Sequence, residues 1–387
     1  MRSVDVFRLY LLGTLDLEQP NGKQLLTTLA EHGTARSLHR VEIEGREAQD
    51  LAKKIRDLHA YMSSGEPPFD ENALAGLGAK LYDAIVQGPV RTLLAKAPSA
   101  TDAKPLPLEI VVEDTTIAGW PWEFLHDTQN GYLCRRYYPI SRSAFNLSRL
   151  TEPRPSTDPV RILFVLGATR RDPEADIEEQ LHRHKALFAK LEHGNVAKVE
   201  VKEAAHPRDI IAAANPGAFD IFHFFGHAGF DYGRKEGYLR FSTNDDKDYR
   251  YYANDFADFL LGRDFRLVFL NACETAVAAS DRDPARSALA AAILERGIPA
   301  VIATQFLMPD NSAHFFSELI YEKLSSGLSL RQAMRDGRES MKFGEKVRHP
   351  DWGIPVLYAA YPELVIFPKN RNSPAASAVR GGRTPKR

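Results

Sequence analysis

The feature that most constrains the fold is an alternation of short apolar runs with amphipathic segments in the second half of the chain. The apolar runs lie at 161–166, 196–201, 219–225, 266–271, 300–304 and 354–359, and the helix-like segments at 175–192, 208–214, 253–261, 284–295, 311–324 and 329–342. Strands buried on both faces are continuously apolar, and parallel strands need a crossover segment between them. The pattern predicts an α/β fold with a doubly wound, mostly parallel sheet and helices on both faces.

The rest of the chain predicts four parts. A run with three prolines at 151–159 has linker composition and marks a boundary. We therefore expect an α+β region at 1–70, a supporting subdomain at 71–150, the α/β domain at 160–367 and a tail at 370–387. Before the linker, strands are predicted at 4–12, 41–43, 108–113 and 132–141, and helices at 46–62 and 71–87. The tail has five basic residues and no acidic ones, which predicts disorder.

Charge and motifs exclude several partners. The 50 Lys and Arg residues are balanced by 51 Asp and Glu residues, so no overall basicity indicates nucleic acid. Neither G-x-x-x-x-G-K-[ST] nor G-x-G-x-x-G follows the first strand of the α/β domain, where Gly-Ala-Thr-Arg-Arg-Asp stands at 167–172. No window approaches the ~18 consecutive apolar residues of a spanning helix. We expect no cofactor, nucleic-acid partner or membrane insertion.

The cysteine count favours a reducing compartment. The chain has two cysteines, Cys134 and Cys273, which are too few for a disulfide framework. The first apolar run is interrupted by Asp5 and Arg8, and no small-residue cleavage site follows it, which favours a strand over a signal peptide. We therefore expect a cytoplasmic location.

Two predicted strand ends carry reactive side chains. One apolar strand leads to His227, whose neighbours Gly226 and Gly229 predict a turn, and another leads to Cys273. Ligand sites of open parallel sheets form at the carboxyl ends of the strands. A thiol attacks as the thiolate and needs a base such as imidazole nearby. The 46-residue separation accommodates one loop, one helix and one strand, so the two residues are candidates for base and nucleophile.

Other interpretations of these residues remain open. Cys273 can be a small buried hydrophobic residue, and His227 can be structural. A metal site built from His223, His227, Cys273 and His314 is conceivable, although C-x-x-C and H-E-x-x-H spacings are absent. We expect no metal, and we expect His223, which lies inside its strand, to be a core histidine.

Two tryptophans around a proline, at 120–122, predict a rigid, packed corner. Glu123 follows them and is flanked by apolar residues. We expect it to orient a buried group.

Four segments, in this order along the chain, resemble motifs of CHAT domains, which are caspase-like, separase-related cysteine peptidases of clan CD found mostly in bacteria. They are Trp-Pro-Trp-Glu-Phe-Leu-His-Asp at 120–127, Phe-His-Phe-Phe-Gly-His-Ala-Gly at 222–229, Phe-Leu-Asn-Ala-Cys-Glu-Thr at 269–275 and Arg-Gly-Ile-Pro-Ala-Val-Ile-Ala-Thr-Gln at 296–305. The resemblance covers roughly residues 70–365. It implies a caspase-like fold for the α/β domain.

The resemblance also implies roles for single residues. His227 would be the general base and Cys273 the nucleophile that forms an acyl-enzyme. Backbone N–H groups of Ala228, Gly229 and Cys273 would bind the oxyanion. CHAT domains usually have glycine directly after the histidine, where this chain has Ala228.

Substrate specificity is implied by the similarity to separases, in which an acidic residue beyond the cysteine lines the pocket for a basic side chain. Asp310 resembles that residue, and an arginine substrate would give it a charge-assisted partner. Asp310 could instead cap the following helix. Asp231 and Glu236, in the segment after His227, are alternative pocket acids.

The function that we expect is that of a cysteine endopeptidase, cleaving a specific protein partner after Arg or Lys. CHAT peptidases often await an activating partner or ligand, so residues 1–70 are a candidate regulatory or docking region, and antiviral defence or cell death is the expected setting. The first alternative is a catalytically silent caspase-fold interaction module. The second is a metalloprotein or thiol transferase.

Overall fold

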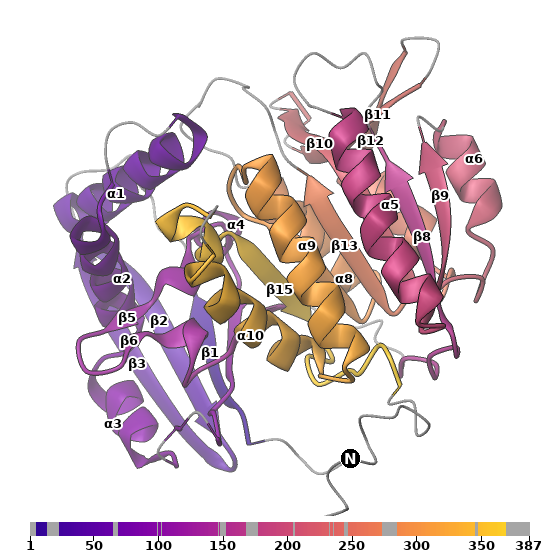
Figure 1. Ribbon diagram of the computed structural model, residues 1–387. Helices are drawn as coiled ribbons and strands as arrows, with labels where there is room; N and C mark the ends of the chain where they lie inside the picture. The colour runs from indigo at the N-terminus through magenta and orange to yellow at the C-terminus, as the bar shows by residue number, and fades with distance from the viewer. Residues whose placement is uncertain are drawn as a thin grey trace, which may run out of the picture.

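The computed structural model describes residues 5–13, 23–64, 69–98, 100–101, 103–145, 147, 152–167, 177–203, 206–231, 233–234, 236–243, 247–272, 285–344 and 347–368. Cys273 and the tail predicted at 370–387 lie outside the described residues. Figure 1 shows the described elements as ribbons, from indigo at the amino terminus to yellow near the carboxyl terminus.

Within the described residues, 13 strands form one sheet. They are β1 (Phe7–Leu12), β2 (Lys23–His32), β3 (Ala35–Glu44), β4 (Leu108–Val112), β7 (Ile140–Ala144), β8 (Val160–Leu166), β9 (Ala197–Glu203), β10 (Ile221–Asp231), β11 (Glu236–Ser242), β12 (Asp248–Tyr252), β13 (Leu267–Ala272), β14 (Ala300–Thr304) and β15 (Pro355–Ala359). A separate small ribbon consists of β5 (His126–Asp127) and β6 (Gly131–Tyr132).

The helices connect and cover these strands. The α-helices are α1 (Gly45–Ser64), α2 (Glu71–Ile85), α3 (Gly88–Lys96), α4 (Thr115–Ala118), α5 (Ile177–His193), α6 (Pro207–Ala213), α7 (Ala253–Leu260), α8 (Ala285–Glu295), α9 (Asp310–Ser325) and α10 (Leu330–Lys342). Short 3-10 helices are η1 (Trp122–Phe124), η2 (Leu133–Arg135) and η3 (His349–Gly353).

The sheet is mixed but mostly parallel. Its order is β12-β11-β10-β13-β14-β15-β7-β4-β1-β2-β3, and β8 pairs with both β10 and β9. The strands β9, β8, β10, β13 and β14 pair in parallel, as do β15, β7, β4 and β1. β15 is antiparallel to β14, and β2, β3, β11 and β12 add antiparallel edges.

Helices cover both faces of the α/β part. Successive side chains of a strand point to opposite faces. In β10, Ile221 and Phe225 therefore belong to the core shared with α5 and α9, whereas Phe222 and Phe224 belong to the core shared with α7 and α8. In Figure 1, α5 and α9 lie in front of the strands and α8 lies behind them. The predicted doubly wound fold is confirmed.

The amino-terminal strands extend the same sheet. β1 pairs in parallel with β4 and antiparallel with β2, so the predicted α+β region is continuous with the rest of the sheet. Phe7 and Leu9 are fully buried and belong to the same core cluster as residues of α1 and α2. The division into domains at 71 and 160 remains a prediction.

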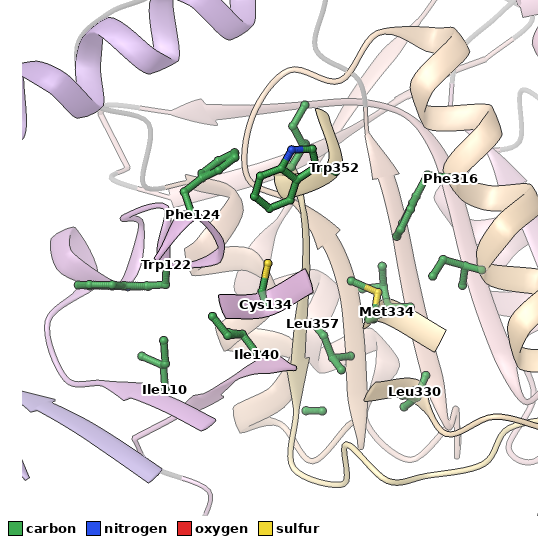
Figure 2. Close-up of a cluster of buried hydrophobic side chains, with 14 of the residues drawn as sticks. Ile110, Trp122, Phe124, Cys134, Ile140, Phe316, Leu330, Met334, Trp352 and Leu357 are labelled. Carbon is green, nitrogen blue, oxygen red and sulfur yellow. The ribbon is translucent and has the colours of Figure 1, made fainter. Parts of the chain in front are cut away.

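The corner around Trp122 is packed, as predicted. Trp120 and Trp122 are 4% and 0% exposed. Figure 2 shows Phe124 beside Trp352, and their ring centres lie 5.0 Å apart in an edge-to-face arrangement. Cys134 lies near them, and its thiol donates to the backbone oxygen of Glu123 at 3.0 Å.

Three segments differ from the sequence prediction. The hairpin of β2 and β3 was not predicted as a pair; its two-residue turn relies on Gly33, with a φ of 59° that glycine adopts easily. The strand predicted at 132–141 is wrong for most of its length, because η2 comes first and β7 begins at Ile140. The polar segment after His227 contains β11 and β12.

Within the part of the chain that the structure describes, no helix is long and apolar enough to cross a membrane.

Candidate active site

His227 lies where β10 leaves the parallel sheet. Up to Gly226 the strand pairs with β13, and up to Phe225 it pairs with β8 on its other side. From His227 onward its only pairing among the described residues is antiparallel to β11, with His227 opposite Arg240. The turn predicted at His227 is therefore a continuous strand, with a side chain 6% exposed at the carboxyl end of the parallel part.

Close packing explains the glycines around His227. A Cβ at Gly226 would lie 3.1 Å from the Cα of Gly167, and a Cβ at Gly229 would lie 2.6 Å from the hydroxyl of Tyr238. Ala228, between them, points to the face opposite His227 and packs in the core with α7 and α8. A methyl group is therefore accommodated at the position where glycine is usual.

The other strand end is fixed from two sides. Ala272, the last residue of β13, pairs with Gly226, and Cys273 follows it outside the described residues. Thr304 of β14 donates its hydroxyl to the backbone oxygen of Ala272 at 3.3 Å. Asn271 donates to Ser317 of α9 at 3.0 Å. The Ala272 carbonyl belongs to the peptide bond that leads to Cys273. These contacts therefore hold the chain directly before that residue.

A buried imidazole cluster, defined as His184, His223 and His314, lies between β10 and the helices α5 and α9. His184 lies 5.7 Å from His223 and 5.4 Å from His314 between ring centres. His223 is a buried core histidine, as predicted, with Nδ1 3.1 Å from the hydroxyl of Tyr321. Among the described residues, its Nε2 and the Nε2 of His184 have no hydrogen-bond partner.

Burial keeps the two inner imidazoles neutral. It lowers the pKa of His184 to about 4; the bond to the Gln180 carbonyl opposes this shift, and His314 adds a smaller lowering. Burial also lowers the pKa of His223 well below its ordinary value, with a smaller contribution from the neighbouring His184. Burial in a low-dielectric interior favours the neutral form of an imidazole.

A second buried group, the ionic cluster, is defined as Glu123, Arg142 and Gln305. Glu123 is fully buried and accepts both Nε and Nη2 of Arg142, the Nε bond measuring 3.0 Å. Gln305 donates to Glu123 at 3.0 Å and accepts from Arg142 at 2.7 Å. Burial alone would lower the pKa of the Arg142 guanidinium, but the Glu123 carboxylate and the Tyr358 hydroxyl together outweigh burial and raise that pKa. Glu123 thus orients a buried arginine, as expected.

Sequence reasoning did not find the partners of Glu123. Arg142 is a charged residue in the buried strand β7. Buried charges are almost always paired, so this arginine was a candidate partner for Glu123. Gln305 lies directly after β14 and ties η1 to β14 and to the backbone oxygen of Gly353 at 2.6 Å. The cluster therefore fixes the start of the segment that runs from β14 to α9.

Asp310 is the first residue of α9 and is partly exposed. Pro309 occupies the cap position, so Asp310 is not the N-cap residue, and its carboxylate lies in the first turn, where the helix dipole favours a negative charge. Ser312, in the same turn, donates to Asp351 at 2.6 Å. A role for Asp310 in a substrate pocket remains a prediction.

The alternative pocket acids are engaged in local structure. Asp231 accepts from the hydroxyl of Tyr252 at 2.9 Å and from the N–H groups of Gly233 and Arg234. The Arg234 N–H and then the Tyr252 hydroxyl lower the pKa of this carboxyl. Glu236 accepts from the N–H of Asn254 at 2.8 Å. Asp231 therefore ties β10 to β12, and Glu236 ties β11 to the first turn of α7.

The metal alternative gains no support from the described part of the chain. His223, His227 and His314 are described, and no group of three or more ligating side chains is arranged there to hold an ion. Cys273, the fourth residue of that alternative, lies outside the described residues.

Comparison with known proteins identifies the family. A family model described as CHAT domain matches residues 76–365. No curated protein matches. Separase, in two structures of the Saccharomyces cerevisiae separase–securin complex, is similar in fold at 13% identity, with TM-scores of 0.51 and 0.50, over 92% of this chain.

This chain spans 30% of that separase chain. The Arg-specific cysteine proteinase gingipain R also matches at 13% identity, over 82% of this chain and 74% of the proteinase, with a TM-score of 0.45. The likeness to separase shows a shared fold. The family match covers most of the chain, and the chain belongs to the CHAT domain family.

Proposed function

We propose that this protein is a cysteine endopeptidase in which His227 and Cys273 form a catalytic dyad. The observation that carries the proposal is the register of β10 and β13: Gly226 pairs with Ala272, so His227 and Cys273 are the next residues of two adjacent parallel strands. Residues that follow a paired position in parallel strands start about 5 Å apart. The family adds the expectation of a peptidase.

In the proposed reaction, His227 takes the proton of the Cys273 thiol and the thiolate attacks the carbonyl carbon of the scissile peptide bond. The C–N bond breaks as the leaving amine receives that proton from His227, and a thioester to Cys273 remains. Water then attacks the thioester while His227 accepts its proton. The carboxylate product leaves and the thiol is restored.

The edge of β10 that faces away from β11 supports an oxyanion site. Beyond Gly226, the described residues place no strand on that edge. N–H groups of a strand alternate between its two edges, so part of the 227–229 backbone can donate outward. We assign oxyanion binding to N–H groups of Ala228, Gly229 and Cys273.

We further propose that Asp310 contacts a basic substrate side chain, so that cleavage follows Arg or Lys. Its support is position: it ends the segment that begins at Thr304, whose hydroxyl holds the Ala272 peptide. A carboxylate can bind a guanidinium through two parallel hydrogen bonds.

The proposal also covers how the peptidase is activated and in which cellular process it acts. A similar structure holds separase together with securin, and we propose that this chain likewise acts with a protein partner or ligand, through residues 1–70. We place it in the cytoplasm, in antiviral defence or cell death. Full activity of the purified chain without any partner would contradict the activation step.

A peptide library with Arg or Lys at the cleavage position tests the activity. The intact chain should cleave it, and Cys273→Ala should remove cleavage. Cys134→Ala is the matched control: burial raises the pKa of the Cys134 thiol to about 12, so this thiol does not react and its loss leaves cleavage in place. Cleavage that persists in Cys273→Ala would refute the mechanism, and failure of the chain to react at Cys273 under any condition would favour the interaction module.

A further inference from the structure

Arg348 links parts of the chain that are distant in sequence. Its Nη2 donates to the backbone oxygen of Met62, near the carboxyl-terminal end of α1, at 3.1 Å. Its Nε donates to Asp351 in η3 at 3.1 Å. Its guanidinium also lies over the ring of Tyr61, 5.9 Å from the ring centre. Because the guanidinium is a planar fork with fixed donor directions, satisfying both acceptors fixes the end of α1 relative to η3.

Asp351 connects Arg348 to α9. Its side chain is fully buried, and its second oxygen accepts from the hydroxyl of Ser312 at 2.6 Å. Burial is the main cause that raises the pKa of the Asp351 carboxyl, and Ser312 and Arg348 oppose it. Ser312 is 1% exposed and lies two residues after Asp310. The first turn of α9 is therefore tied to α1 through two side chains.

A second contact reaches the other end of the same segment. His59 of α1 packs edge-to-face on Phe306, with ring centres 4.5 Å apart. Phe306 is 2% exposed and directly follows Gln305 of the ionic cluster. The segment from Gln305 to Asp310 is thus held by α1 near its start and, through Arg348, at its end.

We propose that Arg348, Asp351 and Ser312 are positioning residues for Asp310, and that the end of α1 is part of the apparatus that recognises a basic substrate side chain. This inference rests on the proposed function. A two-point contact between a carboxylate and a guanidinium depends on geometry within about 0.5 Å, so loosening the first turn of α9 should weaken it selectively. Whatever displaces α1 would therefore alter substrate choice before it alters the nucleophile.

The test separates recognition from reactivity. Two peptidyl chloromethyl ketones, ending in arginine or in citrulline, alkylate Cys273 as its sulfur displaces chloride. Citrulline has nearly the shape of arginine but no charge. Iodoacetamide alkylates the same thiol without filling a side-chain pocket. Rates of labelling are measured on the full chain by mass spectrometry, with the site read from Cys273-containing peptides.

The variant is Arg348→Met, and its matched control is Arg154→Met. Arg154 is also a partly exposed arginine that pairs with a fully buried aspartate, Asp220, at 2.8 Å and donates to a distant backbone oxygen, that of Phe219, at 2.7 Å. Those contacts lie before β10 begins, at the opposite end of the strand from His227.

We expect the intact chain to react faster with the arginyl than with the citrullinyl ketone. Arg348→Met should lower that ratio about tenfold, the effect of weakening one charge-assisted hydrogen bond pair, while iodoacetamide labelling stays within about twofold. Arg348→Lys, which keeps the charge, should restore part of the ratio. His59→Ala, a milder change that leaves Arg348 in place, should lower it in the same direction.

Each other outcome is decisive. An unchanged ratio in Arg348→Met and His59→Ala overturns the inference and leaves the proposed function standing. An equal fall in Arg154→Met would make the effect general destabilisation and also overturns it. If the intact chain does not distinguish the two ketones, the role of Asp310 fails and this inference fails with it. If iodoacetamide does not label Cys273 in the intact chain, the nucleophile itself is wrong.

Discussion

The ionic cluster and the imidazole cluster both lie beside strands that carry the proposed site, and they keep buried polar groups by opposite means. The ionic cluster keeps full charges, because Glu123 and Arg142 neutralise each other and Gln305 satisfies both. The imidazole cluster keeps no charge, because burial holds His184 and His223 neutral. Paired charges stay ionised across a wide pH range. Acid protonates buried neutral imidazoles, and this lowers the free energy of unfolding. We therefore expect removal of one charged side chain to destabilise the ionic cluster, and acid to destabilise the imidazole cluster.

The largest effect is expected from breaking the ionic cluster on one side. Glu123→Ala leaves the Arg142 guanidinium buried without its carboxylate, and such a loss costs about 3–5 kcal/mol of the free energy of unfolding. Urea denaturation of the variant and the intact chain measures the difference.

Two comparisons sharpen that prediction. The double variant Glu123→Leu with Arg142→Met removes both charges and should recover most of the loss. Glu339→Ala, which breaks a more exposed pair with Arg135, should cost under about 1 kcal/mol. A loss in Glu123→Ala as small as that in Glu339→Ala would show that the buried charge is not the cause.

The imidazole cluster should make the fold sensitive to acid. The pKa of His184 is lowered from 6.5 to about 4 in the folded chain, so its contribution is fully present above pH 6.5 and is lost as the pH falls towards 4. The loss for this residue is about 3 kcal/mol, from about 1.4 kcal/mol per pKa unit. His223 should add in the same direction, and His314, with Glu318 beside it, should add less.

The measurement is the free energy of unfolding from pH 7.5 to pH 4 for the intact chain, for His184→Phe and for His182→Gln. His182 lies on the same helix but is exposed, so its variant should keep the acid sensitivity. His184→Phe should flatten the curve. If its curve is as steep as that of the intact chain, burial of His184 does not explain the acid sensitivity.

A smaller effect is expected at the junction of the two regions, where Thr304 holds the Ala272 carbonyl. Thr304→Val has the same shape without the donor, and loss of one such hydrogen bond, about 1 kcal/mol, corresponds to a roughly fivefold slower alkylation of Cys273. Thr304→Ser keeps the hydroxyl and should react at the original rate. Equal rates in the valine and serine variants would remove the positioning role of this hydroxyl.

The sequence carried most of the fold because buried parallel strands leave continuous apolar runs, as in β8, β10, β13 and β14. The prediction missed β11, although its alternation of Tyr238 and Arg240 with apolar residues is the period-two pattern of a half-buried strand. The sequence predicted that His227 and Cys273 each follow an apolar strand, and the structure makes β10 and β13 neighbours. The contacts of Arg348 could not be predicted. Its hydrogen bond to Met62 joins residues 286 positions apart through a backbone oxygen, which has no sequence signature.

The dyad is the central claim, and the pH dependence of Cys273 alkylation by iodoacetamide tests it most directly. A neighbouring imidazole stabilises the thiolate, so the intact chain should reach half its maximal rate well below pH 8.5, the ordinary pKa of a cysteine thiol. In His227→Ala the midpoint should rise to about 8.5. Identical midpoints in the two proteins would contradict the dyad.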